Sequence, residues 1–135
     1  MDESLVKEMY EELADKIKTI IPVKWDKILL RAEVQKEVNS VYYCFYESET
    51  GQLKEYSSLT KEYGVDRKRR MFFTTEISRI IKMLYDYFIK IGEKKWTTIT
   101  YILEKDGTIK VEYGYEDLDN SDEVTRKELW KEKYL

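Results

Sequence analysis

Hydrophobic positions recur at helical spacing in three parts of the chain. Residues 3–21 carry apolar side chains three or four apart, which predicts an amphipathic helix that ends before Pro22. The same period predicts a long helix from Asp66 to about Lys90. A final helix is predicted from Asn120 or Ser121 onward. The apolar positions expected to face the core are Leu5, Met9, Leu13, Ile17 and Ile20, then Phe73, Ile77, Ile80, Ile81, Leu84, Phe88 and Ile91, then Val124, Leu129, Trp130 and Tyr134.

Alternating or continuous apolar runs predict five strands between these helices. They cover residues 25–35, 41–46, 53–57, 96–105 and 109–115. In the first strand the polar set that includes Lys27, Arg31 and Glu33 is expected to face solvent, so the strand should be half-buried. Asp106-Gly107 predicts a tight hairpin turn between the last two strands.

The order of elements predicts an α+β fold. It reads helix, three strands, helix, two strands, helix, with residues 59–65 irregular or forming one helical turn. Every strand connection is a hairpin or a helix, so we expect one antiparallel sheet of about five strands with helices mainly on one face. No repeat or linker interrupts the pattern, which predicts a single domain over residues 1–135.

Composition narrows the class of partner. The net charge is −3 and the pI is about 5.2, which argues against general binding to a nucleic-acid backbone and favours a basic partner. The first four residues are polar or charged apart from Met1 and no long apolar run follows them, so neither a signal peptide nor a membrane span is expected. The predicted location is the cytoplasm.

The residue types present exclude several kinds of catalytic site. The chain has no histidine, which removes the commonest general base near neutral pH and the usual zinc ligand sets. The lone cysteine, Cys44, lies in an apolar strand and reads as a small core residue, and it has no disulfide partner. The five glycines are scattered and form no phosphate-binding loop. We therefore expect no cofactor, no metal and no catalytic residue; an enzyme that uses carboxylates alone is the weakest alternative.

Charge is distributed unevenly in two places. The segment from Val111 to Thr125 has six acidic residues and no lysine or arginine. Its carboxylates, with two tyrosines beside them, indicate either a protein-binding surface or a solvated loop followed by the acidic first turn of a helix. The residues assigned to that surface are Glu112, Tyr113, Tyr115, Glu116, Asp117 and Asp119. The second asymmetry is the basic run Arg67–Arg70, which opposes the dipole of the helix that it begins. We interpret it first as a solvated helical turn, partly offset by Asp66 and Glu62.

Several ordered blocks of the chain resemble the YezG-like immunity proteins. The blocks are Ile21–Ile28, Ala32–Val34, Trp96–Glu104, Asp106-Gly107, Tyr113–Leu118 and Leu129–Leu135. They span nearly the whole chain in the same order. Three parts depart from the pattern: Gly114 stands between the two tyrosines where a polar residue is expected, and residues 35–40 and 67–70 match nothing typical of the family.

The resemblance implies a cytoplasmic antitoxin of Gram-positive bacteria. Such a protein neutralises the C-terminal domain, often a nuclease, of a large secreted toxin of the LXG or related type, and it does so by binding. The expected partner is therefore the cognate toxin nuclease domain, with no membrane or direct nucleic-acid contact, and a homodimer is compatible with the sequence. The alternative is a nucleic-acid-binding or regulatory module that uses residues 67–70.

Overall fold

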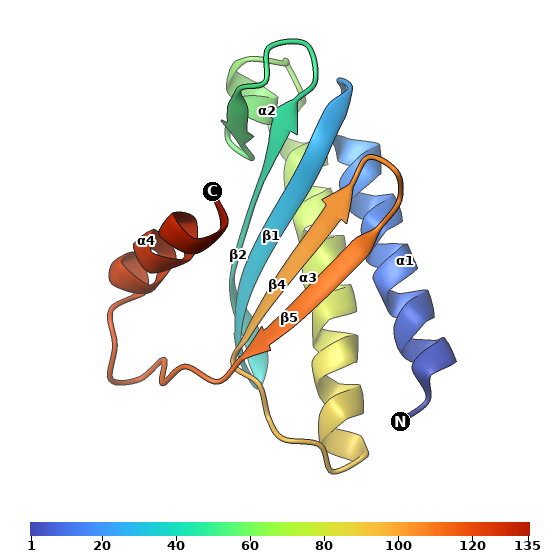
Figure 1. The fold of residues 1–135 in the computed structure, drawn as a ribbon, viewed down its shortest axis with the longest axis vertical. Coiled ribbons are helices and arrows are strands. Elements are labelled where there is room, and N and C mark those ends of the chain that lie inside the picture. Colours follow the sequence, from blue (N-terminus) through green and yellow to red (C-terminus); the bar gives the residue numbers. More distant parts are fainter.

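The computed structural model describes all residues 1–135 and confirms the α+β class. The sheet is antiparallel, with five strands in the order β3-β2-β1-β4-β5 (Figure 1). The elements in chain order are α1 (Glu3–Ile20), β1 (Trp25–Gln35), β2 (Glu37–Glu47), β3 (Leu53–Glu55), α2 (Ser58–Lys61), α3 (Arg67–Lys90), β4 (Thr98–Glu104), β5 (Ile109–Gly114) and α4 (Glu123–Tyr134).

Aspartate side chains cap the three long helices. Asp2 accepts a hydrogen bond from the backbone N–H of Leu5 at 3.1 Å, and Asp66 accepts one from Lys68 at 2.7 Å. Asp122 accepts one from Thr125 at 2.9 Å. Each carboxylate satisfies a backbone donor that the first helical turn leaves free. The cap at Asp122 places the start of α4 at Glu123, slightly later than predicted.

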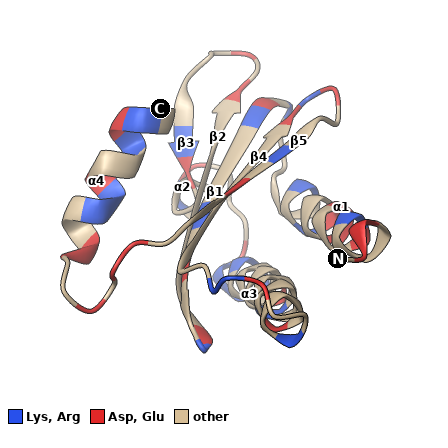
Figure 2. Cartoon of the chain, turned by 60° about the horizontal axis from the view of Figure 1, so that its bottom comes forward, with Lys and Arg blue, Asp and Glu red and all other residues tan.

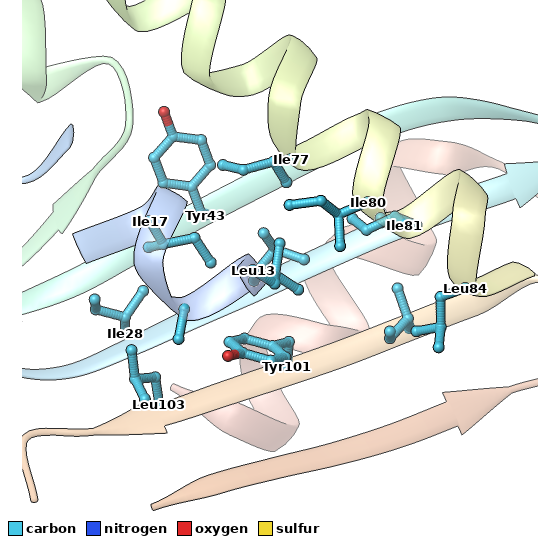
Figure 3. Packing of buried hydrophobic residues seen from close by; sticks show 14 of the residues in the cluster. Leu13, Ile17, Ile28, Tyr43, Ile77, Ile80, Ile81, Leu84, Tyr101 and Leu103 are labelled. Atoms are coloured by element: carbon cyan, nitrogen blue, oxygen red, sulfur yellow. The ribbon is translucent and has the colours of Figure 1, made fainter. Parts of the chain in front are cut away.

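Helices α1 and α3 pack together on one face of the sheet and form the main core with it. Figure 3 shows Leu13 and Ile17 of α1 meeting Ile77, Ile80, Ile81 and Leu84 of α3 above Ile28, Tyr43, Tyr101 and Leu103 of the sheet. Trp96 precedes β4 and is fully buried in the same core. Two core positions predicted for these two helices are wrong: Leu5 is 39% exposed and Ile91 is exposed just after α3, because the buried stripe of α1 starts at Val6 and α3 ends at Lys90.

Helix α4 lies on the opposite face of the sheet (Figures 1 and 2). It covers a second, smaller cluster that consists of Leu29, Tyr42, Cys44, Ile102 and Trp130. Cys44 is buried there as predicted, and desolvation raises the pKa of its thiol to about 12. Val124 and Leu129, expected in the core, are 68% and 59% exposed because only one side of this short helix meets the sheet.

The prediction that β1 is half-buried is wrong. Its residues Ile28–Val34 are all buried, since α1 and α3 cover one face and α4 covers the other. Arg31 and Glu33, expected to face solvent, are each only 4% exposed. None of the helices combines the length and the apolar character needed to cross a membrane.

Candidate functional site

The acidic loop, which we define as Tyr115–Glu123, runs from the end of β5 to the first residue of α4. Its five carboxylate side chains are all on exposed residues, and Figure 2 shows them as red segments along the loop. They are Glu116, Asp117, Asp119, Asp122 and Glu123. No lysine or arginine lies within the loop, so it concentrates negative charge at one edge of the molecule.

Hydrogen bonds within the loop fix its shape. Asp117 accepts from the backbone N–H groups of Asp119 at 3.0 Å and Asn120 at 3.2 Å, and from the Asn120 side chain at 2.8 Å. Ser121 Oγ donates to the Asp117 carbonyl. The side-chain hydrogen bond from Asn120, followed by the backbone N–H groups, holds the pKa of Asp117 below its usual range. The carboxylate is therefore ionised at neutral pH.

Two further carboxylates of the loop are also held in place. The backbone N–H of Thr125, followed by its hydroxyl, lowers the pKa of Asp122. Gln35 Nε2 donates to Asp119 at 3.0 Å, which ties the loop to the end of β1. A charged loop that is already ordered loses less conformational entropy when a partner binds.

Tyr115 is the exposed aromatic residue of the loop. Half of its surface is exposed, and Lys94 Nζ lies 4.2 Å from the centre of its ring. Thr97 Oγ1 donates to the backbone carbonyl of the next residue, Glu116, at 2.7 Å, which anchors the start of the loop to the segment before β4. Tyr115 is thus presented on a fixed backbone beside the carboxylates.

Glu116 belongs to a network of charges beneath α4. Arg31 donates to Glu33 at 2.7 Å and to Glu116 at 3.3 Å. Arg126, from α4, donates to both oxygens of Glu33, each at 2.8 Å. Burial opposes ionisation of Glu33, but hydrogen bonds and charges from Arg126 and Arg31 outweigh it, so the pKa of Glu33 is lowered. The network fixes α4 and one end of the acidic loop on the sheet.

Two of the six predicted binding residues, Glu112 and Tyr113, lie in β5 and not in the acidic loop. Glu112 was expected to face solvent, but it lies between β5 and α4, where Tyr134 donates to it and Lys110 Nζ lies 3.3 Å away. The Tyr134 hydroxyl lowers the pKa of Glu112. Tyr113 points to the opposite face, where its hydroxyl bonds that of Tyr10. Glu112 and Tyr113 point to opposite faces because successive side chains of a strand alternate, and Tyr115 lies beyond the end of β5, in the loop.

Tyr113 is partly buried and packs against the core at the border of the sheet. Its ring lies 5.1 Å from both Trp96 and Phe88, centre to centre. Burial raises the pKa of its hydroxyl, with a further contribution from the bond to Tyr10. The exposed part of the predicted surface therefore reduces to Tyr115, Glu116, Asp117 and Asp119.

A groove of about 410 Å³ separates α4 from β4 and β5. Its floor includes the small residues Thr98, Thr100 and Gly114, and one wall carries Leu129 and Trp130 from α4. A Cβ atom at position 114 would overlap Thr98 Oγ1, so glycine fits this floor where a larger residue would force Thr98 to move. The close approach of two strands gives a physical reason for the glycine that departs from the family pattern.

The basic run occupies the first turn of α3. Figure 1 places the start of this helix beside α2, at the end of the molecule away from the acidic loop. Arg69 lies over the ring of Phe73 at 4.9 Å, and Arg70 over that of Tyr56 at 5.8 Å. Phe72, which precedes Phe73 in the same helix, is exposed. The basic and acidic segments therefore form separate surfaces.

The charge network was missed by sequence reasoning. Arg31 and Glu33 fit the polar face of an alternating strand, and Arg126 fits the polar side of a helix. No local signal links Glu33 to a residue 93 positions away. Only the packing of α4 on the sheet brings them together.

Comparison with known proteins gives a consistent result. Residues 6–135 match the family model described as immunity protein YezG-like. The chain is 26% identical over 132 residues to immunity protein YezG of Bacillus subtilis (strain 168), covering 96% of this chain and 87% of that protein. It is 24% identical over 131 residues to type VII secretion system protein EsaG of Staphylococcus aureus (strain NCTC 8325 / PS 47), covering 96% and 80%. Immunity protein YezG of Bacillus spizizenii is 24% identical over 137 residues, covering 100% and 85%.

Proposed function

Because this chain belongs to the YezG-like immunity protein family, we propose that it binds and neutralises the C-terminal nuclease domain of a cognate secreted toxin. The family model carries this proposal, since it covers nearly the whole chain. The relatives are named for immunity or for type VII secretion. From the family resemblance, a secreted toxin of the LXG type is the partner class proposed here, and the cytoplasm of the producing cell is the proposed place of action.

The acidic loop supports a nuclease as the target. A nuclease presents a positive surface to the phosphates of its substrate. Asp117, Asp119 and Asp122 hold negative charge in fixed positions on an exposed loop, so they present an ordered array to such a surface. Opposite potentials speed association and discriminate against partners of the wrong charge.

The mode of action in this proposal is binding alone. Tyr115 is the aromatic anchor and Glu116, Asp117 and Asp119 are the charged contacts. Glu112 and Tyr113 support this surface from beneath, through α4 and the core respectively. Protection of the cell then follows from occupying or distorting the toxin, without a reaction catalysed by this chain.

A titration tests the proposal directly. The purified protein is titrated against the C-terminal domain of the toxin encoded beside it, while binding is followed by calorimetry and nuclease activity on DNA and RNA is followed in parallel. We expect one-to-one binding and loss of nuclease activity at the same ratio. Absence of binding at micromolar concentrations would overturn the proposal.

One observation favours a second candidate function. The exposed residues Arg67, Lys68 and Arg69 lie next to the exposed ring of Phe72, a combination that suits a nucleic-acid backbone and a stacked base. Fluorescence anisotropy with labelled single-stranded and duplex oligonucleotides at 50 to about 200 mM salt tests it. Binding that weakens steeply with salt and is lost in a triple Arg67→Glu, Lys68→Glu, Arg69→Glu variant would support this function.

A further inference from the structure

Strand β5 is a regular edge of the sheet that no other strand covers. Its residues Ile109–Gly114 pair with β4 on one side only, at the end of the strand order (Figure 1). It contains no proline and no bulge, which are common devices for preventing further pairing at a sheet edge. The open side of β5 is therefore able to pair with another strand.

The free backbone groups of β5 can be identified from its pairing with β4. At one end the Thr108 carbonyl accepts a hydrogen bond from β4, and at the other the Gly114 carbonyl accepts one from Thr97. Since the hydrogen bonds of an antiparallel pair involve every second residue, Lys110 and Glu112 also direct their backbone groups toward β4. The backbone groups of residues 109, 111 and 113 therefore point outward and have no partner strand.

The side chains of β5 differ between the two faces of the sheet. On the face of α1 and α3, Ile109, Val111 and Tyr113 are partly buried and pack against the core. On the face of α4, Lys110 Nζ lies 3.3 Å from the Glu112 carboxylate, and these side chains are 67% and 35% exposed. Val111 lies at the centre of this run, with a positive charge on one side of it and a negative charge on the other.

This arrangement is complementary to itself. In two antiparallel copies of β5 with Val111 opposite Val111, Ile109 lies opposite Tyr113 of the second copy, and Lys110 opposite its Glu112. The pairs at 109, 111 and 113 can exchange both hydrogen bonds of an antiparallel ladder, because their backbone groups point outward. Apolar pairs and pairs of opposite charge across two strands both stabilise a sheet.

The other registers of β5 against itself are unfavourable. A shift by one residue places outward backbone groups opposite residues that already bond to β4, so only shifts of two residues keep the hydrogen bonds. A shift of two in one direction places Lys110 opposite Lys110, and in the other direction Glu112 opposite Glu112. Like charges directly opposite each other destabilise a sheet. The register centred on Val111 alone suits the backbone, the apolar and the charged groups together.

The opposite edge of the sheet is less suited to pairing. Strand β3 has three residues, so it offers a much shorter row of backbone groups. Lys54 pairs with Phe45 of β2, which leaves only Leu53 and Glu55 directed outward. A short edge strand is a poor template for another strand.

We propose that the free protein forms a symmetric dimer in which β5 pairs antiparallel with β5 of a second copy, centred on Val111. The two five-stranded sheets then join into one. The acidic loop lies toward β1 and α4, where Glu116 bonds Arg31 and Asp119 bonds Gln35, so it stays outside this interface. One strand pair is a small interface, so we expect a Kd of about 10–100 μM.

Sedimentation equilibrium of the full chain tests the dimer. The protein is measured from about tenfold below to about tenfold above that Kd. We expect the apparent mass to rise from 16.4 kDa toward twice that value as the concentration increases. A mass that stays at 16.4 kDa throughout the range would overturn the inference.

Amide hydrogen exchange of the ¹⁵N-labelled protein locates the interface. At the high end of the concentration range, the outward amides of β5 should exchange at least about threefold more slowly than at the low end, because they are free only in the monomer. These amides belong to Ile109, Val111 and Tyr113. The amides of Lys110 and Glu112 are already bonded to β4, and those of Leu53 and Glu55 lie on the other edge, so both pairs should change little.

Charge reversal tests the register. Lys110→Glu opposes two carboxylates at each charged pair and Glu112→Lys opposes two ammonium groups, so each variant alone should raise the Kd at least about tenfold. A one-to-one mixture of the two variants restores opposite charges at both pairs and should associate about as tightly as the unchanged protein. Lys61→Glu makes the same change of charge at an exposed position of α2, and this control should dimerise normally.

The outcomes separate this inference from the proposed function. A dimer that Lys110→Glu leaves unchanged, or that forms without slower exchange at Ile109, Val111 and Tyr113, would overturn β5 as the interface. Thermal unfolding shows whether each variant keeps its fold; if Glu112→Lys unfolds, Lys110→Glu and the exchange measurement decide. No toxin domain is present in these experiments, so absence of the dimer leaves the immunity role intact, and a failed toxin titration leaves the dimer intact.

Discussion

Among single residues, Glu33 is a buried carboxylate that binds two arginines. It is buried, and it accepts three charge-assisted hydrogen bonds from Arg31 and Arg126. Glu33 joins a guanidinium of the sheet to one of α4, so both would lose their main counter-charge if it were neutral. Removing one member of a buried ion pair is far more costly than removing an exposed charge.

Substitution of Glu33 is therefore expected to destabilise the fold strongly. Glu33→Gln keeps the size of the side chain but leaves two guanidinium groups without their carboxylate, and we expect a loss of about 3–5 kcal/mol in the free energy of unfolding. Urea unfolding followed by circular dichroism measures it. Glu132→Gln, at an exposed position of α4, is the matched control and should change stability by less than about 0.5 kcal/mol. Equal effects of the two substitutions would contradict this account.

Ionisation of Glu33 should make the stability of the fold depend on pH. Burial disfavours its charge, but the arginines lower its pKa overall, so Glu33 stabilises the fold fully above the unfolded value of about 4.3. That stabilisation is lost as pH falls below about 4.3 through the lower folded value. Unfolding measured from neutral to acidic pH should show the difference between the unchanged protein and Glu33→Gln narrowing in this window. A constant difference would show that the charge of Glu33 is not responsible.

Among the three long helices, α4 buries the fewest side chains. Trp130 is its one buried residue, and the indole N–H donates to Thr100 Oγ1 at 2.9 Å. Around Trp130, α4 is held by polar contacts: Arg126 to Glu33, and Tyr134 to Glu112. Helices α1 and α3, in contrast, each bury a long apolar stripe. Helix α4 should therefore open before the rest of the fold.

Loss of the Trp130 side chain is expected to release α4 selectively. In Trp130→Ala, amides of residues 123–134 should lose most of their protection from hydrogen exchange, while those of residues 77–88 in α3 stay protected. Hydrogen exchange with mass spectrometry resolves the two segments. Leu129→Ala, one residue earlier on the exposed side, is the control and should leave α4 protected. Loss of protection in α3 as well would show that α4 and the main core unfold as one unit.

At the scale of the whole molecule, the two charged segments give opposite ends of the protein opposite character. The acidic loop extends from one end of β5, and the basic run begins α3 near α2. A small net charge of −3 conceals this separation. A positively charged partner should consequently approach the acidic end first, even though the protein as a whole is nearly neutral.

Charge reversal in the acidic loop should slow association with the toxin domain. Asp119→Lys with Glu123→Lys avoids Asp117 and Asp122, whose side chains support the loop and the helix cap. We expect an association rate at least tenfold lower at low salt, with a weaker dependence on salt. Stopped-flow or surface plasmon resonance measures both.

The control for that variant is a reversal of two exposed glutamates elsewhere. Glu8→Lys with Glu49→Lys changes the net charge by the same amount but leaves the loop intact. Its association rate should fall much less. If both double variants slow association equally, the overall charge rather than the acidic loop steers the partner.

Much of the fold was predictable because its signals are local. The stripe in α1, the cap at Asp66 and the turn at Asp106-Gly107 each depend on residues within a few positions of one another. The exposed part of the candidate site was predictable for the same reason: Glu116, Asp117 and Asp119 form a run of charge without basic neighbours. Family resemblance, carried by blocks along the chain, was confirmed by the match over residues 6–135.

The sequence by itself determined the elements, their order, the exclusion of histidine chemistry and the acidic character of the segment before the last helix. The tertiary structure alone decided which sides of the sheet are covered. An alternating strand has the same sequence pattern whether its polar face meets water or a buried partner. The pattern therefore predicted that Arg31 and Glu33 are exposed, whereas the structure buries them against Arg126, which lies 93 positions after Glu33 in the chain. Glu112 packs against Tyr134 of α4, while Tyr113 packs against the core on the other face, because successive residues of a strand point to opposite faces.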